Sequence, residues 1–154
     1  MTYPVKLAVT LRPVWHQDPP QIQVGVNNVL QDVVLDQLTV FEFEFAADTV
    51  AELQVKFLNK TDKDTLAEQQ LDKAVIVESV SFFGVSDPRF VWAGAYYPEY
   101  PEPWASQQQQ QGIDLETKLK SHSYLSWNGT WKLEFTVPVF TWMHQIQDLG
   151  WIYK

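Results

Sequence analysis

Residues 39–45 read Thr-Val-Phe-Glu-Phe-Glu-Phe, and this stretch decides the fold class. Three phenylalanines alternate with two glutamates, so the hydrophobic period is two residues. Successive side chains of a β-strand point to opposite faces, which makes this pattern typical of a strand with one buried and one solvated face. The stretch therefore predicts a half-buried strand in an antiparallel sheet.

The same alternation recurs on both sides of this stretch, separated by turn signals such as Asp18-Pro19-Pro20, Asn27-Asn28 and Asn128-Gly129. Further strands are expected at residues 7–11, 22–26, 29–35, 53–57, 75–83 and 131–139. Pro138 inside the last run predicts an edge strand or a bulge there. The spacing favours an all-β fold, an antiparallel β-sandwich of about eight strands that is jelly-roll-like.

Two segments depart from this pattern. Residues 90–127 are rich in Trp, Tyr and Pro and predict a long aromatic loop excursion, and the Gln107–Gln111 run within it is either a short helix or a flexible tip. Residues 141–154 form an apolar C-terminal tail, which we expect to dock onto the sandwich or onto a neighbour. We expect residues 1–154 to form a single domain.

Composition excludes several classes of protein. The 154 residues include 11 basic and 19 acidic side chains, a net charge of −8, which argues against nucleic acid as a partner. No Cys is present, so disulfides, thiol catalysis and thiolate metal sites are excluded. No apolar run is long enough to span a membrane, and the N-terminal sequence lacks the pattern of a signal peptide.

Catalytic motifs are poorly represented. His16, His122 and His144 lie in unrelated segments, and no Ser stands in a Gly-x-Ser-x-Gly motif. Glu42 and Glu44 are about 7 Å apart on one strand face by ordinary strand rise, which favours a solvated pair over the two acids of a glycosidase. We therefore expect no enzymatic activity.

A polar segment between two predicted strands carries a candidate metal site. Asn59, Asp62, Asp64 and Asp72 are oxygen ligands of the kind that suits Ca²⁺. Their spacing does not match an EF-hand, and neighbouring lysines would repel a cation. An ordinary solvated turn is the alternative interpretation.

Aromatic residues are unusually frequent, at 14% of the chain. Rings in Pro-rich loops stack on sugar faces, anchor protein interfaces, or pack the loops onto the fold, and the sequence leaves these three uses open. The candidate contact residues are Trp92, Tyr96, Tyr97, Tyr100, Trp104, Trp127, Trp142 and Trp151.

One stretch resembles a known family. Residues 55–59 (Val-Lys-Phe-Leu-Asn), the polar loop, residues 72–80 and Gly84 are similar to a segment of small calcium-dependent xylan-binding β-sandwich modules. The resemblance implies a Ca²⁺ between the two strands that itself contacts sugar hydroxyls. The overall layout is also similar to small sandwich proteins encoded by tailed bacteriophages.

These observations lead to two hypotheses. The first is a non-enzymatic structural or interaction module in a larger assembly such as a phage virion, as a decoration, tail or fibre-associated protein. Its partners would be other protein subunits, and its location a virion or a cytoplasmic assembly. The alternative is a calcium-dependent carbohydrate-binding module with surface carbohydrate as its partner.

Overall fold

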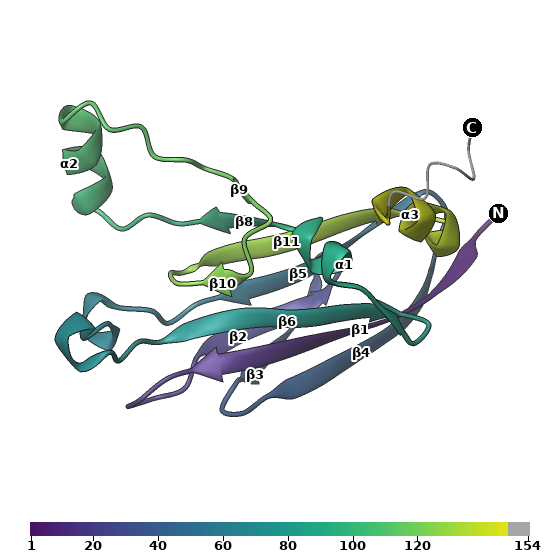
Figure 1. The fold of residues 1–154 in the computed structure, drawn as a ribbon, viewed down its shortest axis with the longest axis horizontal. Coiled ribbons are helices and arrows are strands. Elements are labelled where there is room, and N and C mark those ends of the chain that lie inside the picture. Colours follow the sequence, from purple (N-terminus) through teal and green to yellow (C-terminus); the bar gives the residue numbers. More distant parts are fainter. Residues whose placement is uncertain (148–154) are drawn as a thin grey trace.

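The computed structural model describes residues 1–147 and shows an antiparallel β-sandwich (Figure 1), as the alternating sequence predicts. The first sheet has the strand order β10-β6-β1-β4, with β7 beside β6, and the second has the order β3-β2-β5-β11-β8-β9. The strands of the first sheet are β1 (Tyr3–Val14), β4 (Thr39–Ala47), β6 (Ala74–Phe82), β7 (Val85–Ser86) and β10 (Tyr124–Leu125). Those of the second are β2 (Gln21–Val26), β3 (Val29–Val34), β5 (Val50–Phe57), β8 (Ala95–Pro98), β9 (Leu119–Lys120) and β11 (Gly129–Thr136).

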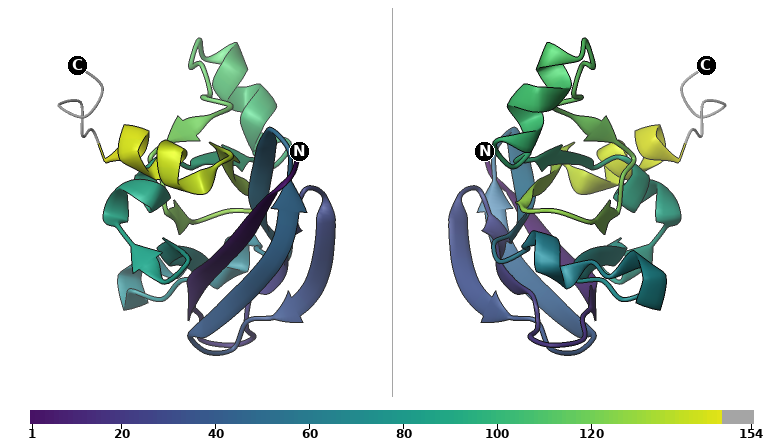
Figure 2. Two further views of the ribbon diagram at one scale, coloured as in Figure 1. Left: turned by 90° about the vertical axis from the view of Figure 1, so that its right-hand side faces the viewer. Right: turned by 90° about the vertical axis from the view of Figure 1, so that its left-hand side faces the viewer.

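The chain passes back and forth between the two sheets, which makes the sandwich jelly-roll-like. β1 lies in the first sheet, β2 and β3 in the second, β4 in the first and β5 in the second. The views of Figure 2 look roughly along the strands and show the sheets as two layers. Apolar side chains from both inner faces fill the space between them.

An aromatic cluster fills one end of this core. The ring centroid of Phe82 lies 5.5 Å from that of Phe90, 4.9 Å from Phe135 and 5.4 Å from Trp142. Two of these rings come from helices that close this end, α1 (Pro88–Trp92) and α3 (Val139–Ile146). Asp87 accepts a hydrogen bond from the backbone N–H of Arg89, so an Asp-Pro pair starts α1 in the usual way.

The strand quoted first from the sequence has an edge position. β4 ends the first sheet and β3 ends the second, and a groove of about 580 Å³ opens between them. Phe43 and Phe45 line this groove and are only partly buried. The alternation thus identified the strand correctly, while its aromatic face is covered only in part because no further strand lies beside it.

Two local predictions need correction, and one turn signal has a different setting from a hairpin. The turn signal Asn128-Gly129 lies between strands of different sheets, because β10 pairs with β6 whereas β11 pairs with β5 and β8. Pro138 does not interrupt an edge strand: β11 is internal to its sheet, ends at Thr136, and Pro138 immediately precedes α3. The predicted excursion over residues 90–127 is shorter, because α1, β8, β9 and β10 belong to the sandwich.

The part of that excursion that leaves the body is residues 99–118, here called the arm. It projects beyond the sheets and carries α2 (Trp104–Gln110), so most of the glutamine run is helical (Figure 1). The predicted C-terminal docking tail, residues 141–154, overlaps α3, which packs on the core through Val139, Trp142 and Met143. Residues 148–154 lie outside the described part. Within residues 1–147, no helix has the length and apolar character needed to cross a bilayer.

Candidate functional site

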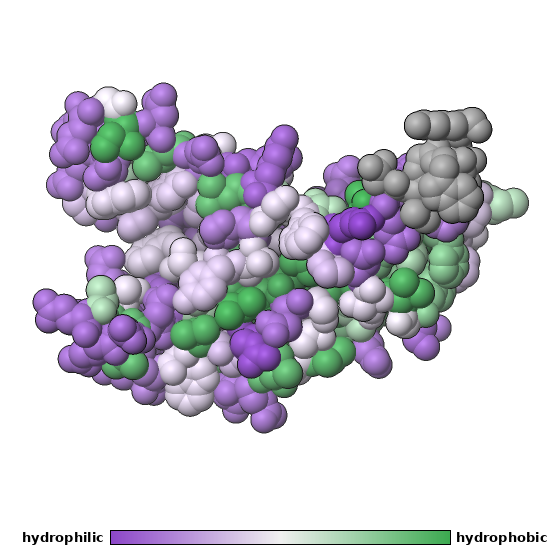
Figure 3. Space-filling view, viewed as in Figure 1, coloured by the Kyte–Doolittle hydropathy of each residue, from purple (hydrophilic) through white to green (hydrophobic). Residues whose placement is uncertain are grey.

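A cleft of about 360 Å³ separates the arm from the loop after β5. Figure 3 shows this hollow between the arm, at upper left, and the body of the molecule. It is called the arm cleft below. The residues that line it are Asp62, Tyr100, Pro101, Glu102, Pro103, Trp104, Ser126 and Trp127.

Three aromatic rings give the arm cleft its apolar surface. Tyr100 and Trp104 lie next to each other on the arm, with ring centroids 5.8 Å apart and an angle of 40° between the ring planes. The Tyr100 hydroxyl donates to the backbone oxygen of Glu116 on the returning part of the arm, at 2.5 Å. Trp104 is 42% exposed and Trp127 is partly buried, so ring surface remains available to a ligand.

Polar groups lie beside these rings. Asp62 belongs to the short 3₁₀ turn Asp62–Asp64 across the cleft from the arm, and within residues 1–147 it forms no ion pair. Glu102 accepts a hydrogen bond from the Ser106 hydroxyl at 2.6 Å and so is held on the arm side. Carboxylates beside flat rings are suited to accept hydrogen bonds from hydroxyl groups while the rings contact C–H surfaces.

Asn128 joins the two walls of the cleft. Its side chain accepts a hydrogen bond from the Lys60 N–H at 2.7 Å and donates to the Lys60 carbonyl at 3.0 Å. Its own carbonyl accepts from the N–H of Glu99, the first residue of the arm, at 2.8 Å. The sequence identified Asn128 only as a turn residue, whereas it fixes the loop and the base of the arm to one point.

The adjacent residues complete this anchor. The Tyr96 hydroxyl, which comes from the core, donates to the carbonyl oxygen of Trp127. Gly129 has φ of +153°, and a Cβ at this position would lie 2.4 Å from the backbone oxygen of Tyr97. Only glycine allows this close approach between β11 and β8.

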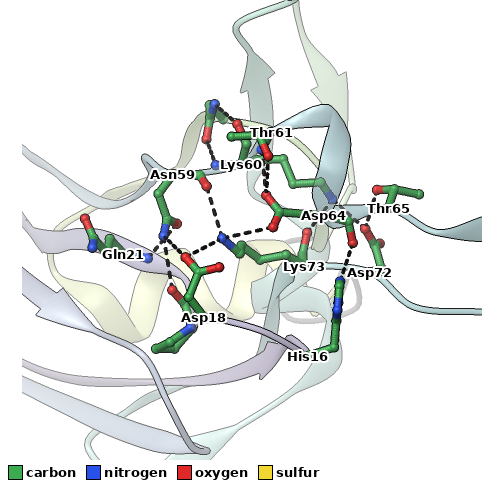
Figure 4. Close-up of polar contacts among 12 residues, drawn as sticks. His16, Asp18, Gln21, Asn59, Lys60, Thr61, Asp64, Thr65, Asp72 and Lys73 are labelled. Atoms are coloured by element: carbon green, nitrogen blue, oxygen red, sulfur yellow. Dashed lines mark hydrogen bonds and ion pairs between the residues drawn. The ribbon is translucent and has the colours of Figure 1, made fainter.

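The loop below the cleft encloses a buried lysine (Figure 4). The Lys73 ammonium group donates to Asp18 at 2.9 Å and to the Asn59 carbonyl at 3.2 Å, and lies 3.3 Å from Asp64. The side chains of Lys73 and Asp64 are 3% and 6% exposed. Burial alone would raise the pKa of Asp64, but hydrogen bonds from Thr61 and the Lys73 ammonium group outweigh burial and lower it.

A second buried lysine lies next to the first. The Lys60 ammonium group donates to Asp72 and to the Lys73 carbonyl, both at 2.5 Å. Asp72 also accepts from the Thr65 hydroxyl at 2.7 Å and the Tyr124 hydroxyl at 2.8 Å. Burial opposes ionisation of Asp72, but these donors together lower its pKa. Burial, followed by the bond to Asp72, raises the pKa of Tyr124 to about 12.

The residues predicted to bind Ca²⁺ do not fit that ion. Asn59, Asp64 and Asp72 do come together, but they surround two ammonium groups, and Asp62 lies apart in the arm cleft. Within residues 1–147 no three acidic or imidazole groups converge on a point that would hold a metal. Lys60, one of the neighbouring lysines expected to repel a cation, and Lys73 supply the positive charge themselves.

The predicted aromatic contact residues divide into several groups. Tyr100, Trp104 and Trp127 line the arm cleft, whereas Trp92 and Tyr97 line a different cleft on the second sheet. The prediction is wrong for Tyr96 and Trp142, which are buried in the core and offer no surface to a partner. Trp151 lies outside the described residues.

Comparison with known proteins gives two solved structures and no sequence relatives. No family model matches the chain, and no curated protein matches its sequence. The selenomethionine form of vCBM60, solved in the context of a circular permutation linking two families of calcium-dependent carbohydrate-binding modules, shares 14% identity over 84% of this chain and 89% of its own, with a TM-score of 0.47. vCBM60 in complex with galactobiose shares 14% identity over 83% of this chain and 96% of its own, with a TM-score of 0.46. Both are likenesses of fold at low sequence identity.

Proposed function

We propose that the protein is a non-catalytic carbohydrate-binding module and that its ligand lies in the arm cleft. The observation that carries the proposal is the composition of this cleft, in which three rings and two carboxylates line one open hollow. Saccharides present both apolar C–H faces and hydroxyl groups, so they match such a lining. This lining supports the carbohydrate-binding part of the alternative hypothesis drawn from the sequence, and the calcium part is considered separately below.

The binding mode follows from the positions of these groups. Trp104 on the arm and Trp127 at the base offer flat surfaces to sugar rings, and Asp62 and Glu102 accept hydrogen bonds from hydroxyls. The Asn128 hydrogen bonds hold both walls before a ligand arrives. A preformed cleft spends little of its binding energy on ordering the site.

We expect binding to be independent of calcium. Lys60 and Lys73 already neutralise the carboxylates that were expected to hold the ion. A Ca²⁺ at this position would have to displace an ammonium group that is almost completely buried. This separates the proposal from the calcium-dependent mechanism that the sequence resemblance implies.

The test is a glycan array on the purified chain, run with calcium and with a chelator, followed by calorimetry on the best ligand. Trp104→Ala should weaken binding by about tenfold or more, because an aromatic contact contributes on the order of 1 kcal/mol beyond its buried area. Trp15→Ala is the matched control, since Trp15 is 41% exposed but lies outside the cleft. Glycan binding that Trp104→Ala leaves unchanged would contradict this site.

The hypothesis of a virion subunit stays a prediction from the sequence. If the protein binds no glycan on the array, either in calcium or in chelator, the carbohydrate proposal is wrong. Protein partners of the exposed rings would then be the hypothesis to test.

A further inference from the structure

The second sheet carries another cleft, of about 340 Å³, on its outer face at the base of the arm. Three lysines line it, Lys118, Lys120 and Lys132, and we call it the lysine cleft. These are three of only 11 basic residues in a chain of net charge −8. Their concentration at one place runs against the overall charge of the protein.

Strand register explains why this cleft exists. Ala95 of β8 pairs with Lys132 of β11 on one side and with Lys120 of β9 on the other. Neighbouring strands are about 4.8 Å apart, so the two lysine backbones are about 10 Å apart on the same face. The side chain of Ala95 is small, so it leaves a hollow between the longer side chains of Lys120 and Lys132.

Two of the ammonium groups in the lysine cleft lie near one aromatic ring. Lys132 Nζ lies 5.0 Å and Lys118 Nζ 6.0 Å from the centroid of the Tyr97 ring, on which both groups converge. In the part of the chain that the structure describes, none of the three lysines forms an ion pair. Like charges held together repel one another, and a bound anion relieves this repulsion.

The other end of the cleft has the opposite character. Glu52 of β5 and Glu134 of β11 are direct cross-strand partners, and both line the cleft. Glu134 lies two residues from Lys132 on the same strand face, about 7 Å away by strand rise. A ligand that fills the cleft therefore meets ammonium donors at one end and carboxylate acceptors at the other.

We propose that the lysine cleft binds an acidic saccharide, with a carboxylate or sulfate group at the lysines and hydroxyl groups at the two glutamates. A sugar acid carries both kinds of group at a separation of a few ångströms, whereas a simple inorganic anion uses only the cationic end. This inference does not rest on the arm cleft, because the residues, the charge and the ligand class all differ.

The test is an NMR titration of the full chain with an oligomer of galacturonic acid, and with the methyl ester of the same oligomer. The acid should shift the backbone amide signals of residues 95–97, 118–120 and 132, and the uncharged ester should leave them in place. Lys120→Gln and Lys132→Gln should each weaken binding of the acid by about tenfold, since hydrogen bonds to charged groups are among the strongest in proteins. Lys6→Gln, an exposed lysine on β1 of the other sheet, should have no effect.

Each result decides the matter. Equal binding of the acid and the ester, binding that survives Lys132→Gln, or no shift at roughly millimolar acid would overturn the proposal. Inorganic phosphate that competes as strongly as the acid would overturn the assignment to a saccharide. Ala95→Leu provides an independent check, because it fills the hollow without removing a charge. This variant should not bind the acid, and its amide signals outside the cleft should keep the positions they have in the wild-type protein.

Discussion

Replacing Lys73 by Met tests the role of the buried lysine directly. Methionine has a similar length and no charge, so the substitution removes the ammonium group and keeps most of the packing. It leaves Asp64 buried without its cationic partner, together with the carbonyl of Asn59. We expect that removing this one charged group lowers the free energy of unfolding substantially.

The magnitude follows from the exposure of each partner. Asp18 is 59% exposed, so water replaces the ammonium group there at little cost. Asp64 is 6% exposed and keeps only its hydrogen bonds from Thr61 after the change. Removing one partner of a buried pair costs about 3–5 kcal/mol, and the Thr61 bonds favour the lower value, about 3 kcal/mol. For a chain of this size this corresponds to a fall in Tm of about 6–12 °C.

Urea unfolding followed by tryptophan fluorescence measures this loss. Lys63→Met is the matched control, because Lys63 is exposed in the same loop and its replacement should change stability by less than about 0.5 kcal/mol. Adding Asp64→Asn to Lys73→Met should recover part of the loss, since the buried charge is then absent. The pKa of Asp64 is lowered in the fold, so its contribution is present above its unfolded pKa and is lost as the pH falls below about 4.

Two results would refute the reasoning. A loss below about 1 kcal/mol in Lys73→Met would show that the ammonium group is dispensable. A wild-type unfolding midpoint that rises with Ca²⁺ and falls with a chelator would show that a metal, and not the lysines, neutralises these carboxylates.

Three further outcomes are expected. Asn128→Ala should lower the free energy of unfolding by about 1–3 kcal/mol, because it leaves the Lys60 N–H and carbonyl without partners, and chemical denaturation will show whether it does. Gly129→Ala should cost about 1–3 kcal/mol through its clash with the backbone of β8, and an unchanged Tm would contradict that close contact. The pKa of Tyr124 is raised from 10.0 to about 12, so its contribution to stability is complete below pH 10 and is lost as the pH rises toward 12. Tyr124→Phe, which cannot donate to Asp72, should give a shallower alkaline decline in unfolding experiments, and a decline equal to that of the wild type would count against this assignment.

The strands could be predicted from the sequence because alternation is a local signal. The runs expected at residues 7–11 and 53–57 became strands with the buried face as expected, and the run expected at residues 131–139 became a strand only as far as Thr136. Their distribution between the two sheets was not predictable, because β4 and β5 are joined by two residues yet pair with different partners. The sheet that each strand joins depends on which long-range pairing buries more surface, and a local sequence pattern does not indicate this.

The site was only partly visible for the same reason. Asp62, Tyr100, Trp104 and Trp127 were each identified, but as members of two unrelated groups, since three separate segments meet only in the folded chain. Two lysines of the polar loop, Lys60 and Lys63, were weighed solely as an obstacle to a metal, and Lys73 was not weighed at all. A signal was present, because lysines interspersed among carboxylates equally fit mutual neutralisation, which the structure shows for Lys73.

The arm is a hairpin connection of unusual length. Its two ends lead into β8 and β9, which pair directly with each other through Ala95 with Lys120 and Tyr96 with Leu119. A short turn between these strands would satisfy the same ladder, so the sandwich does not depend on what the arm contains. The ligand preference proposed for the arm cleft would therefore be separable from the fold: a different loop grafted between β8 and β9 would change the lining of this cleft and leave the core as it is.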